Sequence, residues 1–163
     1  MNNELLTLFD IKDDIVESFT IDNIGTYYEI NIRFKPSVVC CPHCGSIHFI
    51  SKGTQKKRLV STPINDQPVK MITHLKRYKC LDCNSYFSDT NPIAYENWSF
   101  TKVAVISILN KLKPYNATYA SIARMFGVST TRIIDVFDAF VRIKRHNLPK
   151  VLLIDEFHFS RHT

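Results

Sequence analysis

Two pairs of cysteines constrain this chain of 163 residues more than any other feature. Cys41 and Cys44 form one C-x-x-C pair, and Cys80 and Cys83 form the other. Two such pairs can surround one tetrahedral zinc ion at Zn–S distances of about 2.3 Å. The interval between the pairs is longer than is usual for zinc sites, so we expect a hairpin to bring the pairs together. The pattern predicts a closed, structural zinc ribbon with four cysteine ligands.

The same cysteines have two alternative interpretations, a disulfide framework and a redox motif. Disulfides are disfavoured in the cytosol, and a redox C-x-x-C would need a thioredoxin-like βαβ unit, which the sequence pattern lacks. Cys40 is interpreted as a free thiol, with the alternative that it replaces its neighbour Cys41 as a ligand. Three histidines are not expected to be ligands, because four thiolates complete the shell: His43, His48 and His74.

Positive charge is concentrated between the two cysteine pairs. The whole chain has a net charge of +6, yet residues 50–80 contain eight Lys and Arg against the single acid Asp66. Such a stretch suits a polyanionic partner. We expect two extended arms, at about 49–59 and 69–79, around a loop at 61–68. The basic residues predicted to contact DNA phosphates from these arms are Lys56, Lys57, Arg58, Lys76 and Arg77.

The segment before Pro36 has a different pattern. Residues 15–22 and 28–34 alternate between apolar and polar side chains, which indicates two strands, and a turn signal at 22–25 predicts that they form a hairpin. A short helical turn is expected at 4–9. Acids outnumber bases in this segment, so it is not expected to touch phosphate.

The pattern becomes helical from residue 101. Thr101, Thr118 and Ser129 are each placed to cap a helix, and Gly127 supplies the tight turn between the second and third helices. This spacing predicts a helix-turn-helix whose third helix enters the DNA major groove by its first turn. An ordinary three-helix bundle is the alternative. The inner face of the first helix is predicted to hold Val105, Ile106, Leu109 and Leu112, and the DNA contacts of the third are predicted at Ser129, Thr130, Thr131 and Arg132.

The order of these motifs resembles the ISL-three family of insertion-sequence transposases. The resemblance covers the first cysteine pair, the basic hairpin, Arg77-Tyr78-Lys79-Cys80 with the second pair, the helix-turn-helix, and an apolar run at 151–154 that leads into Asp155. It implies an RNase H-like catalytic domain of the DDE type, with Asp155 as the first acid of the triad. Magnesium or manganese would act only in a full-length enzyme. The other two acids are missing here, so this chain is expected to be inactive alone.

The sequence thus predicts a small multi-module α+β chain. The expected modules are an N-terminal β-hairpin at 1–36, a zinc ribbon at 37–92, a helix-turn-helix at 99–148, and the truncated start of an RNase H-like domain at 150–163. The expected function is sequence-specific binding of double-stranded DNA at insertion-sequence terminal repeats during DNA transposition. A stand-alone zinc-ribbon and helix-turn-helix transcription regulator is the alternative.

The expected partners and location follow from the same interpretation. The interpretation allows a homodimer or pairing with full-length transposase, and the sequence does not decide the oligomeric state. No apolar run approaches the roughly 20 residues that cross a bilayer, and the N-terminus lacks the features of a signal peptide. We therefore expect a cytoplasmic, nucleoid-associated bacterial protein with no membrane partner.

Overall fold

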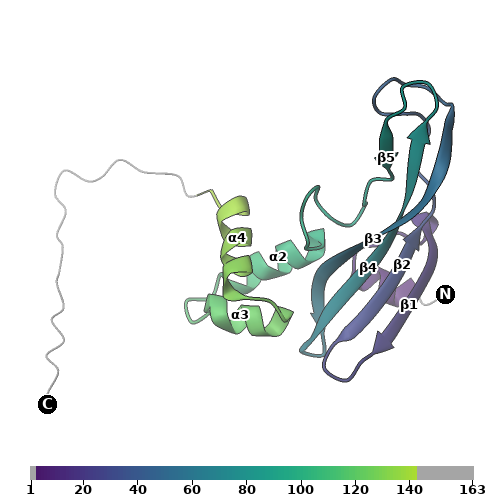
Figure 1. Cartoon of the computed structure of the whole chain (residues 1–163). Helices are drawn as coiled ribbons and strands as arrows, with labels where there is room; N and C mark the ends of the chain where they lie inside the picture. The colour runs from purple at the N-terminus through teal and green to yellow at the C-terminus, as the bar shows by residue number, and fades with distance from the viewer. Residues whose placement is uncertain (1–2, 143–163) are drawn as a thin grey trace, which may run out of the picture.

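The computed structural model describes residues 3–142 and has the predicted α+β composition. A twisted mixed sheet lies beside a group of three helices (Figure 1). No helix within residues 3–142 has the length and apolar character needed to cross a membrane. The apolar run at 151–154, and with it the predicted start of a catalytic domain at 150–163, lies outside the described residues.

The leading segment forms the predicted hairpin. A short helix, α1 (Asn3–Leu8), and a 3-10 turn, η1 (Asp13–Ile15), precede the antiparallel strands β1 (Val16–Asn23) and β2 (Tyr28–Phe34). The Asn23 side chain accepts a hydrogen bond of 2.8 Å from the backbone N–H of Gly25 and stabilises the turn. As the alternation predicted, β2 buries Ile30, Ile32 and Phe34 on one face.

The leading hairpin is part of a larger sheet. Strands β3 (Phe49–Ile64), β4 (Gln67–Cys80) and β5 (Tyr86–Ser88) complete it in the order β1-β2-β4-β3, with β5 also paired to β4. Strand β2 runs parallel to β4 and pairs with it from Tyr28 to Arg33. The predicted boundary between modules at residues 36 and 37 therefore lies within one hydrogen-bonded sheet.

The loop predicted at 61–68 was wrong in its bounds. Strands β3 and β4 continue to a turn at Asn65 and Asp66, whose φ angles are 48° and 60°. Pro63 was taken as a sign of a loop. It is accommodated in β3 because it lies in the irregularity of the β3–β4 pairing between Ser61 and Ile64, where no regular N–H donor is needed.

In the half of the sheet that contains β2, one face is covered by the core and the other face is open. A core that includes Ile30, Ile32, Val69 and Met71 packs against Leu6 and Phe9, at and just after α1. The side chains on the opposite side of these strands form what we call the open face. It includes the basic Arg33, Lys56, Arg58 and Lys70, the acidic Asp22 and Glu29, and Ser18, Thr20, Asn31, Ile72 and His74.

Three helices form the second core. They are α2 (Lys102–Lys111), α3 (Tyr119–Phe126) and α4 (Thr130–Phe140). Thr101 and Thr118 cap α2 and α3 as predicted, by accepting hydrogen bonds from the backbone N–H groups of Ala104 and Ser121. Helix α4 ends at Phe140, and Val141 is extended, so this helix is shorter than the helical region predicted to reach residue 148. Residues 143–148 lie outside the described residues.

The inner face of α2 differs from the prediction at one position. Ala104, Val105 and Ile108 are buried, whereas Ile106 is 56% exposed. The predicted Leu109 and Leu112 are partly buried and pack against this core. The cause is geometric, because the 3.6-residue turn places 104, 105 and 108 on one side of the helix and rotates 106 away from it.

The helices are fixed to the exposed edge of β3. The Val60 N–H donates to the Ser99 carbonyl at 2.8 Å, and the Thr101 N–H donates to the Val60 carbonyl at 2.9 Å. The buried hydroxyls of Ser61 and Thr101 lie 3.2 Å apart. These contacts cover the edge strand, a site that would otherwise invite pairing with another chain.

Candidate metal centre and nucleic-acid interface

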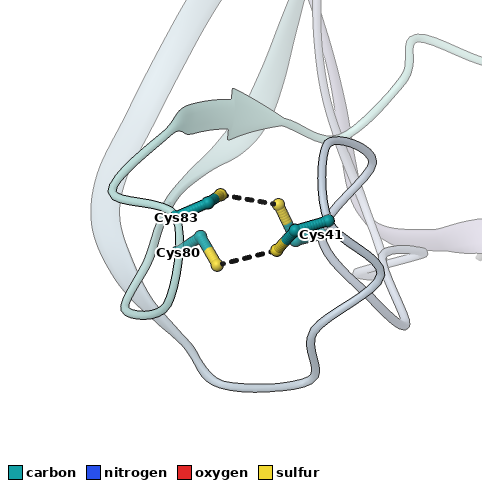
Figure 2. A group of neighbouring side chains, drawn as sticks. Cys41, Cys80 and Cys83 are labelled. Atoms are coloured by element: carbon teal, nitrogen blue, oxygen red, sulfur yellow. Dashed lines mark hydrogen bonds between the residues drawn. The ribbon is translucent and has the colours of Figure 1, made fainter.

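The four predicted cysteines converge on one point. The sulfur atoms of Cys41, Cys44, Cys80 and Cys83 all lie within 4.8 Å of one another, and two loops bring them together (Figure 2). The Cys41–Cys83 and Cys44–Cys80 sulfur distances are 3.7 and 3.6 Å. A tetrahedral ion with metal–sulfur distances of about 2.3 Å separates its sulfurs by about 3.8 Å. This cysteine cluster could therefore hold one metal ion.

Each cysteine pair lies in a loop of the same design. The Cys41 N–H donates to the Ser46 carbonyl at 2.7 Å, and the Cys80 N–H donates to the Ser85 carbonyl at 2.9 Å. The first loop reverses at Gly45, with φ of 74°, and the second reverses at Asn84, with φ of 58°. Asparagine tolerates this left-handed conformation better than most residues. The second loop thus uses an asparagine where the first uses a glycine, and no sequence pattern signalled this role for Asn84.

The β3–β4 hairpin joins the two loops, as the sequence predicted. Phe49 pairs with Cys80 at the end of the hairpin, and the Leu81 N–H donates to the His48 carbonyl at 2.9 Å. The His48 ring lies 3.4 Å from the Asp82 carboxylate. Cys40 is exposed and does not belong to the cluster.

The thiols differ in acidity. Hydrogen bonds from the side chain and the backbone of Ser85 lower the pKa of Cys83 to about 6. For Cys44 the backbone N–H of Ser46 lowers the pKa, but the hydrogen bond to Cys83, burial and the other two thiols together raise it to about 12. The Cys83 thiolate is therefore available near neutral pH, and a cation must displace the proton of Cys44.

A buried carboxylate holds the segment that leads to Cys41. Asp89 accepts hydrogen bonds from the backbone N–H groups of Ser37 and Val38 at 3.0 and 3.1 Å, and from the Tyr78 hydroxyl at 3.1 Å. Burial and the Asp89 charge raise the pKa of Tyr78 to about 12. These contacts tie the approach to the first cysteine pair to β4. No sequence pattern signalled this role for Asp89.

The basic residues predicted for DNA contact do not share one surface. Lys56 and Arg58 lie on the open face of β3, whereas Lys57 alternates to the opposite face. Lys76 lies two residues after His74 on β4 and therefore on the same side of that strand. Arg77 is exposed and lies where β4 pairs with β5. The prediction grouped neighbours in sequence, but a strand sends neighbours to opposite faces.

The first turn of α4 leaves three of its four predicted DNA-contacting residues exposed. Ser129, Thr130 and Thr131 are solvent-exposed, and Ser129 occupies the N-cap position without a side-chain cap hydrogen bond. Arg132 was expected to point away from the core. Instead it is half-buried, lies 4.6 Å from the centre of the Phe100 ring, and donates a hydrogen bond to the Ser99 hydroxyl.

A groove joins the open face to the turn between α3 and α4. Its volume is about 430 Å³. Arg58 and Lys70 line it from the sheet together with the acidic Glu29, and Gly127, Val128 and Arg132 line it from the helical side. The start of α4 and the basic open face thus lie on the same side of the molecule.

Asp155, the acid that the family resemblance assigns to catalysis, lies outside the described residues. The fit of the cysteine cluster to a metal ion and the position of the basic groove are properties of this structure itself. Comparisons with family models, with curated proteins and with solved structures found no match for this chain.

Proposed function

We propose that this chain binds double-stranded DNA in a sequence-specific way, with α3 and α4 as a helix-turn-helix and a structural zinc ion in the cysteine cluster. The observation that carries the proposal is the position of the exposed first turn of α4 beside the basic groove. A helix that enters the major groove needs its N-terminal residues free, and phosphates on either side of that groove need cations nearby.

The connection between α3 and α4 supports the helix-turn-helix assignment. Gly127 ends α3 in the left-handed conformation, with φ of 63°, and its N–H bonds to the carbonyls of Ala123 and Arg124. Helix α4 then begins at Thr130, after a connection of three residues that ends at the N-cap Ser129. Short glycine-containing turns of this kind join the two helices of DNA-binding helix-turn-helix motifs. The buried Ala123 and Phe126 provide the close packing that the motif requires.

The cysteine cluster supports a structural role for zinc. Zinc accepts four thiolates in tetrahedral geometry, and the cluster offers four thiols at matching separations. A fully thiolate shell has no open position for a substrate or an activated water molecule. The ion would hold together the open end of the β3–β4 hairpin, opposite its turn, while the basic residues lie along the two strands.

The nature of the DNA comes from the family resemblance alone. It suggests that the target is the terminal repeat of an insertion sequence, and that the chain represents the front part of a DDE transposase. In such an enzyme Asp155 would be the first acid that holds magnesium or manganese. Pairing with a second copy, or with full-length transposase, would bring two DNA ends together.

Selection of bound sequences from a pool of random duplexes tests the proposal. We expect the wild-type chain to enrich a defined sequence. Arg132→Ala should weaken binding to that sequence by about 1–3 kcal/mol and relax the preference at one base pair, provided that Arg132 leaves Ser99 to read a base. Ser99→Ala is the matched control, because it removes the internal partner of Arg132 and leaves the guanidinium in place.

The outcomes separate base reading from simple folding effects. A preference that is relaxed in Arg132→Ala and retained in Ser99→Ala supports the role of α4. Failure of the wild-type chain to enrich any sequence would rule out sequence-specific recognition.

A further inference from the structure

A second, smaller cavity opens on the open face, away from the start of α4. Its volume is about 140 Å³, and it lies between β1, β2 and β4. Its lining residues are Ser18, Thr20, Asn31, Ile32, Arg33 and His74. The leading hairpin contributes all of them except His74, so the cavity exists only because β2 pairs with β4.

The lining has the chemistry of an anion site. Two hydroxyls, an amide, a guanidinium and an imidazole can all donate hydrogen bonds to oxygen atoms. No carboxylate lines the cavity. Glu17 directly precedes Ser18 in β1, and Glu29 accepts a hydrogen bond of 3.5 Å from the Asn31 side-chain nitrogen, but neither carboxylate lines the cavity.

Positive charge surrounds His74. Arg33 from β2 and Lys56 from β3 are its neighbours in the sheet, and β1 adds Ser18 and Thr20 to the cavity, with Glu17 directly before Ser18. Burial, Arg33 and Lys56 lower the pKa of His74. The unoccupied cavity therefore favours a neutral imidazole, and a bound anion would offset this effect by favouring the imidazolium.

We infer that this cavity binds one phosphate group of the DNA backbone, with Arg33 as its main ligand and His74 as a second, proton-dependent ligand. The inference rests on the proposed DNA-binding function. The DNA backbone is the expected source of this phosphate, because Arg33 and His74 share the open face with Arg58 and Lys70, which line the groove beside the start of α4. The cavity is small, which suits a single tetrahedral anion rather than a whole nucleotide.

The leading segment would thus contact phosphate, a role that its composition did not predict. Acids dominate its sequence, and from that balance it was not expected to touch phosphate. Its Asp10, Asp13 and Asp14 lie in or beside α1 and η1. Asp22 and Glu29 pair with each other on the open face, and Glu29 lies four residues along β2 from Arg33. The segment therefore has a basic site despite its acidic composition.

The salt dependence of duplex binding provides the test. Fluorescence anisotropy would measure the affinity of the full chain for duplex DNA over a range of salt concentrations. Arg33→Ala should flatten the slope of log K against log salt by about 0.9, and should weaken binding roughly five- to tenfold near 0.1 M salt. Lys12→Ala is the matched control, because Lys12 is an exposed cation at the N-cap of η1. It should leave slope and affinity unchanged.

The pH dependence supplies a second readout. Uptake of a proton by His74 should strengthen wild-type binding as the pH falls from 8 to 6, and His74→Gln should remove most of that increase. In NMR spectra the His74 ring should titrate at higher pH in the DNA complex than in the free chain. Circular dichroism would confirm that the Arg33→Ala and His74→Gln variants remain folded.

Each outcome decides the inference. Equal salt slopes for wild type and Arg33→Ala would overturn the inference and leave the proposed function standing. A wild-type chain that binds no duplex would overturn both. Inorganic phosphate identifies the source of the anion: phosphate that shifts the His74 ring of the free chain, but causes no further shift once duplex DNA is bound, supports the inference. Phosphate that still shifts the ring at saturating duplex would show that DNA does not occupy the cavity and would overturn the inference.

Discussion

The hydroxyl of Tyr78 carries a proton that the folded chain retains to unusually high pH. Burial and the charge of Asp89 raise the pKa of Tyr78 to about 12, whereas an unfolded tyrosine titrates near 10. Folding therefore favours the protonated form. The resulting contribution to stability is complete below about pH 10 and is lost as the pH rises towards 12. Alkaline conditions should loosen the segment before Cys41, because Asp89 joins Tyr78 to Ser37 and Val38.

Tyr78→Phe tests this linkage. The variant lacks the hydroxyl, so we expect it to be less stable than wild type at pH 8 but to lose less of its free energy of unfolding between pH 10 and pH 12. Urea titrations at several pH values would measure both quantities. Parallel losses of stability in the two proteins over that range would contradict the role assigned to Tyr78.

The cysteine cluster makes a prediction about metal content. We expect the purified chain to carry one zinc ion, and Cys80→Ser to lose it together with the structure of the two cysteine loops. Cys40→Ser is the matched control and should keep the ion, because Cys40 is exposed and outside the cluster. Acid should release the metal, since protons compete with it for the thiolates.

Metal analysis of the three proteins checks these expectations. A wild-type chain without metal would contradict the zinc assignment. Retention of the full zinc content by Cys80→Ser would contradict the proposed ligand set, and loss of zinc from Cys40→Ser would point to the alternative ligand that the sequence left open.

At the scale of elements, the turn between α3 and α4 is fixed by two requirements at Gly127. Its φ angle of 63° is unfavourable for a residue with a side chain, and a Cβ atom at this position would lie 3.0 Å from the Cβ of Pro68. The turn thus packs closely against the end of the β3–β4 hairpin. This contact sets the position of α4 relative to the sheet.

Gly127→Ala should therefore cost about 1–3 kcal/mol of stability, from backbone strain and from the displaced contact with Pro68. Gly25→Ala is a useful comparison, because φ is 91° there and no atom lies within 4 Å of the added carbon. We expect the Gly127 variant to be the more destabilised in urea unfolding. Equal losses would show that the close approach to Pro68 contributes nothing.

Local signals predicted the elements better than their partners. Alternation identified the two strands of the leading hairpin, and threonine caps located the starts of α2 and α3. The parallel pairing of β2 with β4 was not predictable, because alternation specifies which side chains share a face and not which strand lies alongside. The open face and its cavity depend on that pairing, so sequence reasoning could not find Arg33 as a site residue.

In the candidate metal site, too, local motifs were predictable from the sequence and long-range contacts were not. The spacing of the four cysteines was sufficient to predict their convergence, since C-x-x-C pairs are local motifs. Asn84 and Asp89 act through backbone conformation and long-range hydrogen bonds, which leave no periodic pattern. Lys57 lies on the face opposite Lys56 and Arg58, as two-residue alternation within the basic strand requires.

At the scale of the whole molecule, the helices and the sheet act as one unit in the proposed function. Backbone hydrogen bonds at Val60 and the contact between Gly127 and Pro68 join them. The open face, the groove and the start of α4 therefore keep fixed relative positions. A DNA duplex that receives α4 in its major groove would meet Arg58 and Lys70 with its adjacent backbone.

The central claim is that DNA binds on this side of the molecule, and two neighbouring residues of β3 test it most directly. Arg58 lies on the open face and Lys57 on the opposite face, so Arg58→Glu and Lys57→Glu make the same change of charge on different sides. The measurement is the affinity for duplex DNA as a function of salt concentration. We expect a steep salt dependence for wild type, a loss of at least about tenfold in affinity for Arg58→Glu, and a change below about threefold for Lys57→Glu. Salt-independent binding by wild type, or equal losses in the two variants, would contradict the account.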